Sequence, residues 1–351
     1  MKSISLSSSQ NVMWFQQLTG ISEESPAQVR QQLSIDGDCI VCSDGKRIAF
    51  GRLETPKLSE LRQAVFDLKV EPQHSTLNEI VGDACGLHAR PANENAMFQV
   101  ASQFNLLEMT SPSVTPEHGI EIYESDPTQG PACAIACGAG TIYRNYFAPV
   151  GKSIGQSAAV QIDCSSDLGK RLGNVGCRLW EMQNGYLFPT NDGLNEITTK
   201  LHQASEDELN ELRGELRIGL QWQTEVTLRG AKHRVSQAYC SALPVAYDRQ
   251  FPKRSADQWA NFAKLVLDAA YEATLAAAVI NMQNSGSRAV YLTLLGGGVF
   301  GNQEKWILAA IERAFHQHSR HGLDIQIVSY RQSHPAVAEL VRRINASSMS
   351  T

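Results

Sequence analysis

Residues 289–302 read AVYLTLLGGGVFGN, and this stretch decides the fold. Its first half, residues 289–295, is a nearly continuous apolar run that predicts a buried strand, and the glycines after it predict a tight turn. Residues 303–318 then carry apolar side chains at helical spacing, and residues 324–330 form a second strand pattern. A strand, a helix and a strand in this order are typical of parallel strands joined by a crossover helix.

The flanking segments continue the same alternation. From Ser255 onward, apolar residues fall on one helical stripe that includes Trp259, Phe262 and Val266. At the other end, Ser333 as an N-cap and Pro335 in the first turn predict a closing helix. The predicted fold class is therefore α/β, with a mixed, mainly parallel sheet and helices on both faces.

The glycine run stands where a sheet of this kind binds its ligand, at the carboxyl end of a strand. Because Gly296, Gly297 and Gly298 lack a Cβ, their N–H groups can approach a phosphate, helped by the positive end of the following helix. The glycines are not followed by Lys and then Ser or Thr, which argues against a P-loop. A purely structural turn remains the alternative.

The rest of the chain divides at about residue 77. Residues 1–76 hold a polar leader, a predicted hairpin over 38–51 and a predicted short helix over 58–68, and we expect them to form an accessory element. Residues 77–351 form the α/β domain, with a large insertion around 150–250.

Several segments of that domain have a readable pattern. Residues 97–107 predict a buried strand, and residues 131–146 are rich in Ala, Gly and Cys, which suits a helix packed closely on a sheet or a ligand. In the insertion, residues 206–217 predict a charged helix, and residues 221–228 and 233–242 predict strands.

Charge and hydropathy limit the classes of partner. The 351 residues include 31 Lys+Arg and 36 Asp+Glu, a formal net charge of −5, and there is no long basic run. A nucleic-acid partner is therefore not expected. Residues 1–20 lack the apolar core of a signal peptide, and no stretch approaches the ~18 apolar residues of a membrane span. We expect a cytoplasmic protein without a membrane partner, with export as an effector left open.

The cysteines show no metal-ligand spacing, and a metal site at the three late histidines described below is the less favoured alternative. Eight cysteines are too few for a disulfide scaffold in a chain of this length, so reduced thiols are expected. Cys39 and Cys42 form a CxxC in a strand pattern whose alternation points the two sulfurs to opposite faces. His316, His318 and His321 lie late on a predicted helix, a common place for histidine. No metal or other required cofactor is expected.

The segment GGGVFGN, with the helix, strand and helix after it, resembles the carboxyl-terminal part of macrodomains, which are α/β modules that bind ADP-ribose. Residues 81–84, VGDA, are similar to the Gly-Asp-Ile element of that family. Residues 98–105, FQVASQFN, are similar to its strand that ends in Asn-Ala-Ala-Asn. The resemblance covers about residues 77–146 and 255–344.

The resemblance implies ADP-ribose as the ligand and gives residues of this chain their roles. Asp83 and Tyr330 would lie near the adenine, and Asn105 and Phe300 beside the distal ribose. The diphosphate would lie between a first loop that begins at Gln129 and the glycine loop. The ligand-binding residues implied in this way are Asp83, Ala84, Asn105, Gln129, Gly130, Gly296, Gly297, Gly298, Val299, Phe300, Gly301, Asn302 and Tyr330.

The resemblance does not supply the catalytic acid. Hydrolytic macrodomains often carry an Asp in the first loop, and poly(ADP-ribose) glycohydrolases carry paired glutamates just after it, whereas this chain has Ala132 and Cys133. Cleavage at the anomeric carbon of ribose passes through an oxocarbenium-like state, which needs a carboxylate to orient water and stabilise positive charge.

The acidic loop before the first phosphate loop holds five carboxylates, of which three are candidates for the catalytic acid. Asp126 ranks first because it precedes the sequence TQGP by one residue, Glu108 ranks second, three residues after Asn105, and Glu117 ranks third. Asn105 would contact the ribose in the same catalytic site. The alternatives are that Asp126 caps the following helix and that the glutamates are solvated loop charges.

This combination of segments is most similar to divergent macrodomains that include bacterial effectors removing ADP-ribose from ubiquitin. It implies an ADP-ribosylhydrolase that releases mono-ADP-ribose from a modified protein, with ubiquitin or an arginine side chain as the modified partner. A non-catalytic reader of ADP-ribose is the alternative of a different class. A nucleotide-using transferase is a third, weaker hypothesis.

Overall fold

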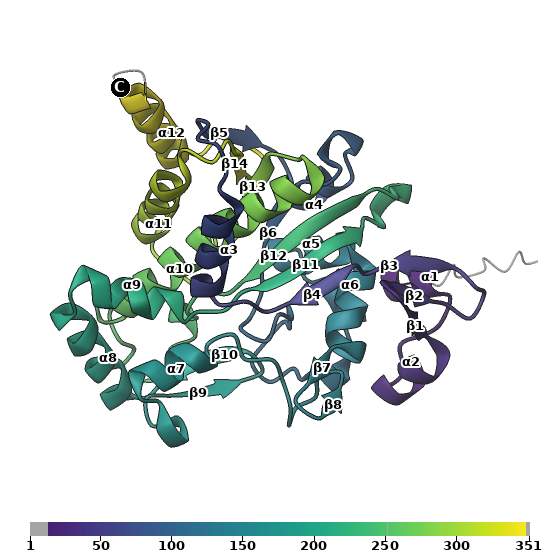
Figure 1. The fold of residues 1–351 in the computed structure, drawn as a ribbon. Coiled ribbons are helices and arrows are strands. Elements are labelled where there is room, and N and C mark those ends of the chain that lie inside the picture. The colour runs from purple at the N-terminus through teal and green to yellow at the C-terminus, as the bar shows by residue number, and fades with distance from the viewer. Residues whose placement is uncertain (1–12, 251, 349–351) are drawn as a thin grey trace, which may run out of the picture.

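The computed structural model describes residues 13–250 and 252–348, which excludes most of the predicted polar leader. A seven-stranded sheet forms its centre (Figure 1). In spatial order its strands are β4 (Arg52–Glu54), β11 (Gly219–Glu225), β12 (Arg234–Cys240), β6 (Met97–Ala101), β13 (Ala289–Leu292), β14 (Asp324–Ser329) and β5 (Thr76–Val81). The pairs from β12 to β5 are all parallel, and β11 runs antiparallel to both of its neighbours.

Helices cover both faces of this sheet, so the predicted fold class is confirmed. One face carries α3 (Leu58–Leu68), α10 (Ala256–Ser285) and α11 (Glu304–His318), and the other carries α4 (Ala84–His88), α5 (Gln129–Ala136) and α6 (Gly138–Ile142). Strand alternation sets these faces. On β6, Gln99 donates to Thr274 of α10 at 3.1 Å, whereas Phe98 stacks on His88 of α4 at 3.8 Å between ring centroids.

The long helix α10 is the central element of its face. Ser255 is its N-cap residue, and the Ser255 N–H donates to Gln258 Oε1 at 2.9 Å. By length and composition it is one helix that could cross a membrane, but 83% of its most apolar window is buried inside the protein. Its Ala-rich surface lets it pack against α11, α3 and α8 (Asn191–Gln203).

The amino-terminal elements form a second, smaller core. They are α1 (Trp14–Thr19), α2 (Pro26–Gln32) and a three-stranded sheet of β1 (Ser34–Asp36), β2 (Cys39–Val41) and β3 (Arg47–Ala49). The predicted hairpin over 38–51 and helix over 58–68 are confirmed. However, β4 joins the central sheet and α3 packs on α10, so only the chain before β4 stands apart from the sheet, at the end opposite α12 (Pro335–Ser348; Figure 1).

The region of the predicted insertion contributes two strands, β11 and β12, to the central sheet. Its other elements are β7 (Pro149–Val150), β8 (Ser153–Ile154), α7 (Ser166–Leu172), β9 (Trp180–Gln183), β10 (Tyr186–Pro189), α8 and α9 (Glu206–Gly214). The predicted strands over 221–228 and 233–242 match β11 and β12 with shifted ends, and the charged helix ends at Gly214.

Two strand predictions are too long: the strand predicted over 289–295 ends at Leu292, and the one predicted over 97–107 differs more. The predicted strand over 97–107 ends at Ala101, and the chain then turns back on itself. Leu106 has a φ of +64°, and the N–H of Gln103 donates to the carbonyl of Leu107 at 2.9 Å. The apolar residues of this segment are therefore buried as a compact loop rather than as an extended strand.

Candidate active site

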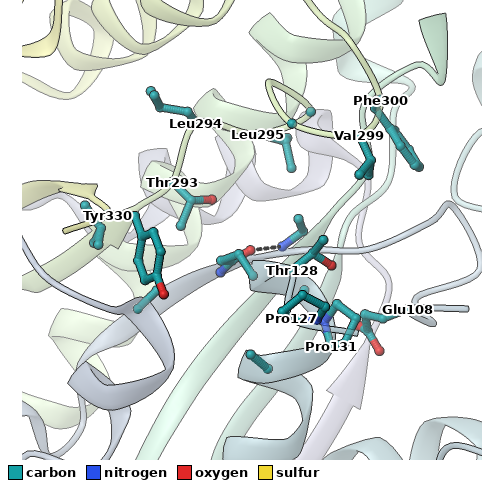
Figure 2. A pocket seen from close by; sticks show the side chains of 18 of the residues that line it. Glu108, Pro127, Thr128, Pro131, Thr293, Leu294, Leu295, Val299, Phe300 and Tyr330 are labelled. Atoms are coloured by element: carbon teal, nitrogen blue, oxygen red, sulfur yellow. Dashed lines mark hydrogen bonds between the residues drawn. The ribbon is translucent and has the colours of Figure 1, made fainter. Parts of the chain in front are cut away.

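A cavity of about 910 Å³ opens at the carboxyl ends of β5, β6, β13 and β14. Its lining comes from the residues that follow these strands, the first turn of α5 and the glycine loop after β13. Figure 2 shows Glu108, Thr128 and Pro131 on one side of the cavity and Leu295 and Phe300 on the other. This is the crevice at which open α/β sheets bind ligands, and its volume lies in the range of small-molecule sites.

The glycine loop is a tight turn that needs two of its glycines. Gly296 and Gly301 have φ values of +73° and +70°, a region that favours glycine. A Cβ on Gly296 would lie 2.4 Å from the Cβ of Ala242. The Asn302 amide closes the loop by donating to the carbonyl of Leu243 at 2.8 Å. These contacts fix the loop without using the side chains that face the cavity.

The first loop brings α5 against the end of β6. Asp126 Oδ1 accepts a hydrogen bond from the N–H of Thr128 at 2.9 Å, just before α5 begins. The Gln129 side chain accepts from the N–H of Ala101 at 3.0 Å. A Cβ on Gly130 would lie 2.3 Å from the carbonyl oxygen of Ala101, so only glycine fits there. The start of α5 is therefore fixed at the edge of the cavity.

Both loops present backbone donors to the cavity. Among the described residues, no hydrogen bond is donated by the N–H groups of Gly298, Val299 and Phe300. The N–H groups of Gln129 and Gly130, in the first turn of α5, likewise donate no hydrogen bond to a described residue. Unpaired N–H groups with a helix amino terminus form a typical binding site for a phosphate.

Glu108 lines the cavity, and both oxygens of its carboxylate are buried. Its side chain is 1% exposed, and neither of its oxygens has a hydrogen-bond partner among the described residues. The nearest cation is Arg144, whose Nη2 lies 3.7 Å from Glu108 Oε1. Burial raises the pKa of Glu108 to about 8, against the opposing effects of the Arg144 charge and of the neighbouring Tyr123 hydroxyl. A carboxyl group that titrates near neutral pH beside a ligand cavity is suited to acid–base chemistry.

The opposite end of the cavity holds the residues expected near the adenine. Asp83 caps α4 by accepting from the N–H groups of Cys85 and Gly86, both at 3.2 Å. Tyr330 follows β14 and is 63% exposed. An exposed aromatic side chain at the mouth of a cavity is typical of a surface that another aromatic ring can cover.

Two groups of lining residues were not predicted from the sequence. Tyr186, Tyr247 and Phe300 form an aromatic wall with ring centroids 5.4 to 5.8 Å apart, of which only Phe300 was expected. The Thr293 hydroxyl is buried without a partner in the described part of the chain. Thr293 directly follows β13, a position that could have identified it, whereas the tyrosines come from the insertion, where the sequence carries no such signal.

The structure gathers most of the predicted site residues around this cavity. Gly297, Gly301 and Asn302 belong to the glycine loop but do not line the cavity, and Asn105 and Glu117 lie outside it. The predicted residues in the lining are Asp83, Ala84, Glu108, Asp126, Gln129, Gly130, Gly296, Gly298, Val299, Phe300 and Tyr330. Their ligand-binding and catalytic roles stay predictions.

Asn105 and Glu117 hold neighbouring loops. The buried Asn105 amide donates to Gln161 at 2.9 Å and accepts from the N–H of Leu107 at 3.1 Å, which stabilises the turn before Glu108. Glu117 accepts from the N–H of Ala158 at 2.8 Å. Because β6 ends at Ala101, the side chain of Asn105 does not reach the cavity.

The described residues contain no group of three or more His, Cys, Asp or Glu side chains that could hold a metal ion. His88 is a core residue, with Nδ1 2.7 Å from the carbonyl of Ala84, and burial lowers its pKa to about 4. His318 is also buried, and its ring centroid lies 5.0 Å from that of His321.

Comparisons with known proteins give distant structural similarities. No protein-family model matches the sequence, and the curated proteins give no match. Poly(ADP-ribose) glycohydrolase from Thermomonospora curvata, bound to the inhibitor ADP-HPD, has 11% identity and a TM-score of 0.42, over 91% of this chain and 96% of that chain. The glycohydrolase from Deinococcus radiodurans in complex with ADP-ribose has 14% identity and a TM-score of 0.42, over 84% and 94%. At these values their function does not transfer to this chain.

Proposed function

We propose that this protein is an ADP-ribosylhydrolase that releases mono-ADP-ribose from a modified protein. The observation that carries the proposal is one cavity with two sets of unpaired N–H groups and a buried, unpaired carboxylate. The two sets of N–H groups suit the diphosphate of ADP-ribose, and the carboxylate suits cleavage at the distal ribose of that ligand. Ubiquitin, which the sequence resemblance implies, is the first modified protein to test.

The diphosphate is held by backbone donors in this proposal. Each N–H given to a charged phosphate oxygen contributes about 1.5–3 kcal/mol, so five of them compensate for the absence of a lysine in the glycine loop. The amino terminus of α5 adds its positive end. A chain of net charge −5 can bind a dianion in this way, because local dipoles rather than net charge determine the field in the cavity.

Glu108 acts on the water in the proposed reaction. The oxygen of water bonds to the anomeric carbon of the distal ribose while the bond from that carbon to the protein side chain breaks. Glu108 takes the proton from water and passes it to the leaving side chain, so the Glu108 carboxylate is regenerated. Asp126, at the mouth of the same cavity, stabilises the positive charge on the ribose ring in the transition state.

Two measurements test the function. Calorimetry with ADP-ribose tests binding, and no heat at millimolar ADP-ribose would exclude both hydrolysis and a reader function. Incubation with mono-ADP-ribosylated ubiquitin, followed by chromatography for free ADP-ribose, tests hydrolysis. Binding without release from any mono-ADP-ribosylated protein tested would contradict the hydrolase and leave the reader.

A further inference from the structure

Arg144 is a fully buried cation directly behind the cavity. Its side chain is 0% exposed, and its guanidinium carbon lies 3.6 Å from the ring centroid of Tyr239 on β12. Its Nη2 lies 3.7 Å from Glu108 and donates to the hydroxyl of Thr141 at 3.2 Å. Its Nη1 has no partner among the described residues. A buried charge with incomplete hydrogen bonding destabilises a fold, so its presence calls for a functional reason.

A local change in helix geometry brings Arg144 to this position. The helix α6 is followed by a wider π turn, Tyr143–Phe147. A π turn adds a residue to the helical turn and is frequent at functional sites. The segment from Gly138 to Ile142 is otherwise small and apolar, so Arg144 is the first charge after a long uncharged stretch of the chain.

Arg144 also supports the loop that carries Glu108. Its Nε donates at 2.9 Å to the carbonyl of Leu106, the residue with a φ of +64°. A leucine in this backbone region is strained and persists only where its surroundings hold it. The same turn is closed by the Gln103 side chain, which accepts from the N–H of Met109 at 2.9 Å and donates to its carbonyl at 3.2 Å. Glu108 therefore projects from a loop whose shape depends in part on Arg144.

We propose that Arg144 is a positioning residue that holds the loop carrying Glu108 and supplies the positive charge that faces its carboxylate. The inference rests on the proposed function, because it assigns Glu108 the work on water. Of the described side chains that pair with Arg144, Glu108 is the one that lines the cavity, so Arg144 acts through that carboxylate.

The titratable groups around Glu108 support an electrostatic role. Arg144 faces it from the π turn, Tyr123 from the 3-10 turn Glu121–Ser125, and Tyr239 from β12. Burial raises the pKa values of both tyrosines, so they stay neutral and Arg144 is the cation that faces Glu108 from these elements. Removing that cation raises the proton affinity of Glu108 further.

Three variants distinguish the effect of the Arg144 charge from the effect of its hydrogen-bond geometry and from a general loss of stability. Arg144→Gln removes the charge, and Arg144→Lys keeps it but removes the planar donor to Leu106. Arg213→Gln is the matched control, since Arg213 is another buried arginine (8% exposed) that pairs with Asp268 on α10, away from the cavity. The readouts are the Glu108 carboxyl titration by carbon-13 NMR, with the resonance assigned by its loss in Glu108→Gln, and the pH profile of kcat.

In Arg144→Gln, we expect the titration midpoint and the kcat inflection to move upward by about one pH unit or more, with no shift in Arg213→Gln. In Arg144→Lys, we expect an inflection near that of the wild type and a fall in kcat of about tenfold, with KM unchanged. A wild-type midpoint in Arg144→Gln, or an unchanged kcat in Arg144→Lys, overturns the proposal.

Two further results also test the proposal: a variant that does not fold, and a wild type that releases no ADP-ribose. If Arg144→Gln does not fold, the kcat and KM of Arg144→Lys decide the positioning role. If the wild type releases no ADP-ribose, the proposed function fails, and the NMR midpoint then decides separately whether Arg144 controls Glu108.

Discussion

Gly130 packs directly against Ala101, so closely that a Cβ on Gly130 would lie 2.3 Å from the Ala101 carbonyl oxygen. This contact joins the first turn of α5 to the end of β6. It fixes the unpaired N–H groups of Gln129 and Gly130 relative to the glycine loop on the other side of the cavity.

Substitution of Gly130 is expected to push the first turn of α5 away from the end of β6. Gly130→Ala places a methyl group against backbone, which cannot rotate away, so we expect a loss of about 1–3 kcal/mol in the free energy of unfolding. Affinity for ADP-ribose should fall in parallel. Denaturant unfolding and calorimetry measure the two effects. Gly214→Ala is the control, because its Cβ meets Ser59 at an ordinary 3.4 Å; equal behaviour of both variants would contradict the packing argument.

Gly298 is the position at which a substitution can test whether the glycine loop binds the ligand. A Cβ on Gly298 would meet no atom within 4 Å, so Gly298→Glu should fold normally. Its carboxylate would stand beside the N–H groups meant for phosphate, and we expect affinity for ADP-ribose to fall about 100-fold or more. Gly298→Gln, of equal size without the charge, should lose much less. Unchanged affinity in Gly298→Glu would mean that the glycine run is only a turn.

Glu108 should make folding stability depend on pH. Its pKa is about 8 in the folded protein and about 4.3 in an unfolded chain. The folded state therefore binds more protons between these values, and its stability falls as the pH rises from about 4 to 8. Glu108→Gln removes this effect, so we expect the variant to be more stable than the wild type by about 3–4 kcal/mol at pH 7.5 and by about 1 kcal/mol at pH 5.

Urea unfolding of both proteins at the two pH values measures this difference. A stability difference that does not change with pH would show that Glu108 is ionised in the folded state, and would remove it as the group that titrates near neutral pH.

Asp126 has two alternative roles that one substitution separates. Asp126→Asn keeps the oxygen that accepts from Thr128 and removes the charge. If the charge stabilises the ribose cation, ADP-ribose release should slow by about 10- to 100-fold with an unchanged melting temperature. Release that persists undiminished in Asp126→Asn and in Asp126→Ala would leave Asp126 as a turn residue only.

The sequence predicts the features of this fold that are locally encoded. The strand and helix over residues 289–318 follow from hydrophobic periodicity, and the turn at Gly296 follows from the backbone freedom of glycine. These signals depend on neighbouring residues, so they can be read without knowing the tertiary structure.

The rest of the site depends on contacts between distant segments. The apolar pattern from Met97 continues past Ala101, so it predicts a longer strand, while the reversal at Leu106 depends on Arg144 from a later helix. Burial of Glu108 likewise results from packing against that arginine. Such contacts join residues tens of positions apart and leave no periodic signal in the sequence.

The central claim is that Glu108 directs hydrolysis in a cavity that binds ADP-ribose. Its most direct test is single-turnover release of ADP-ribose from mono-ADP-ribosylated ubiquitin by the wild type and by Glu108→Gln, with the ADP-ribose affinity of each measured by calorimetry. We expect the variant to bind ADP-ribose within about threefold of the wild type and to release it about 100-fold or more slowly. Equal release rates at equal affinity would contradict the account.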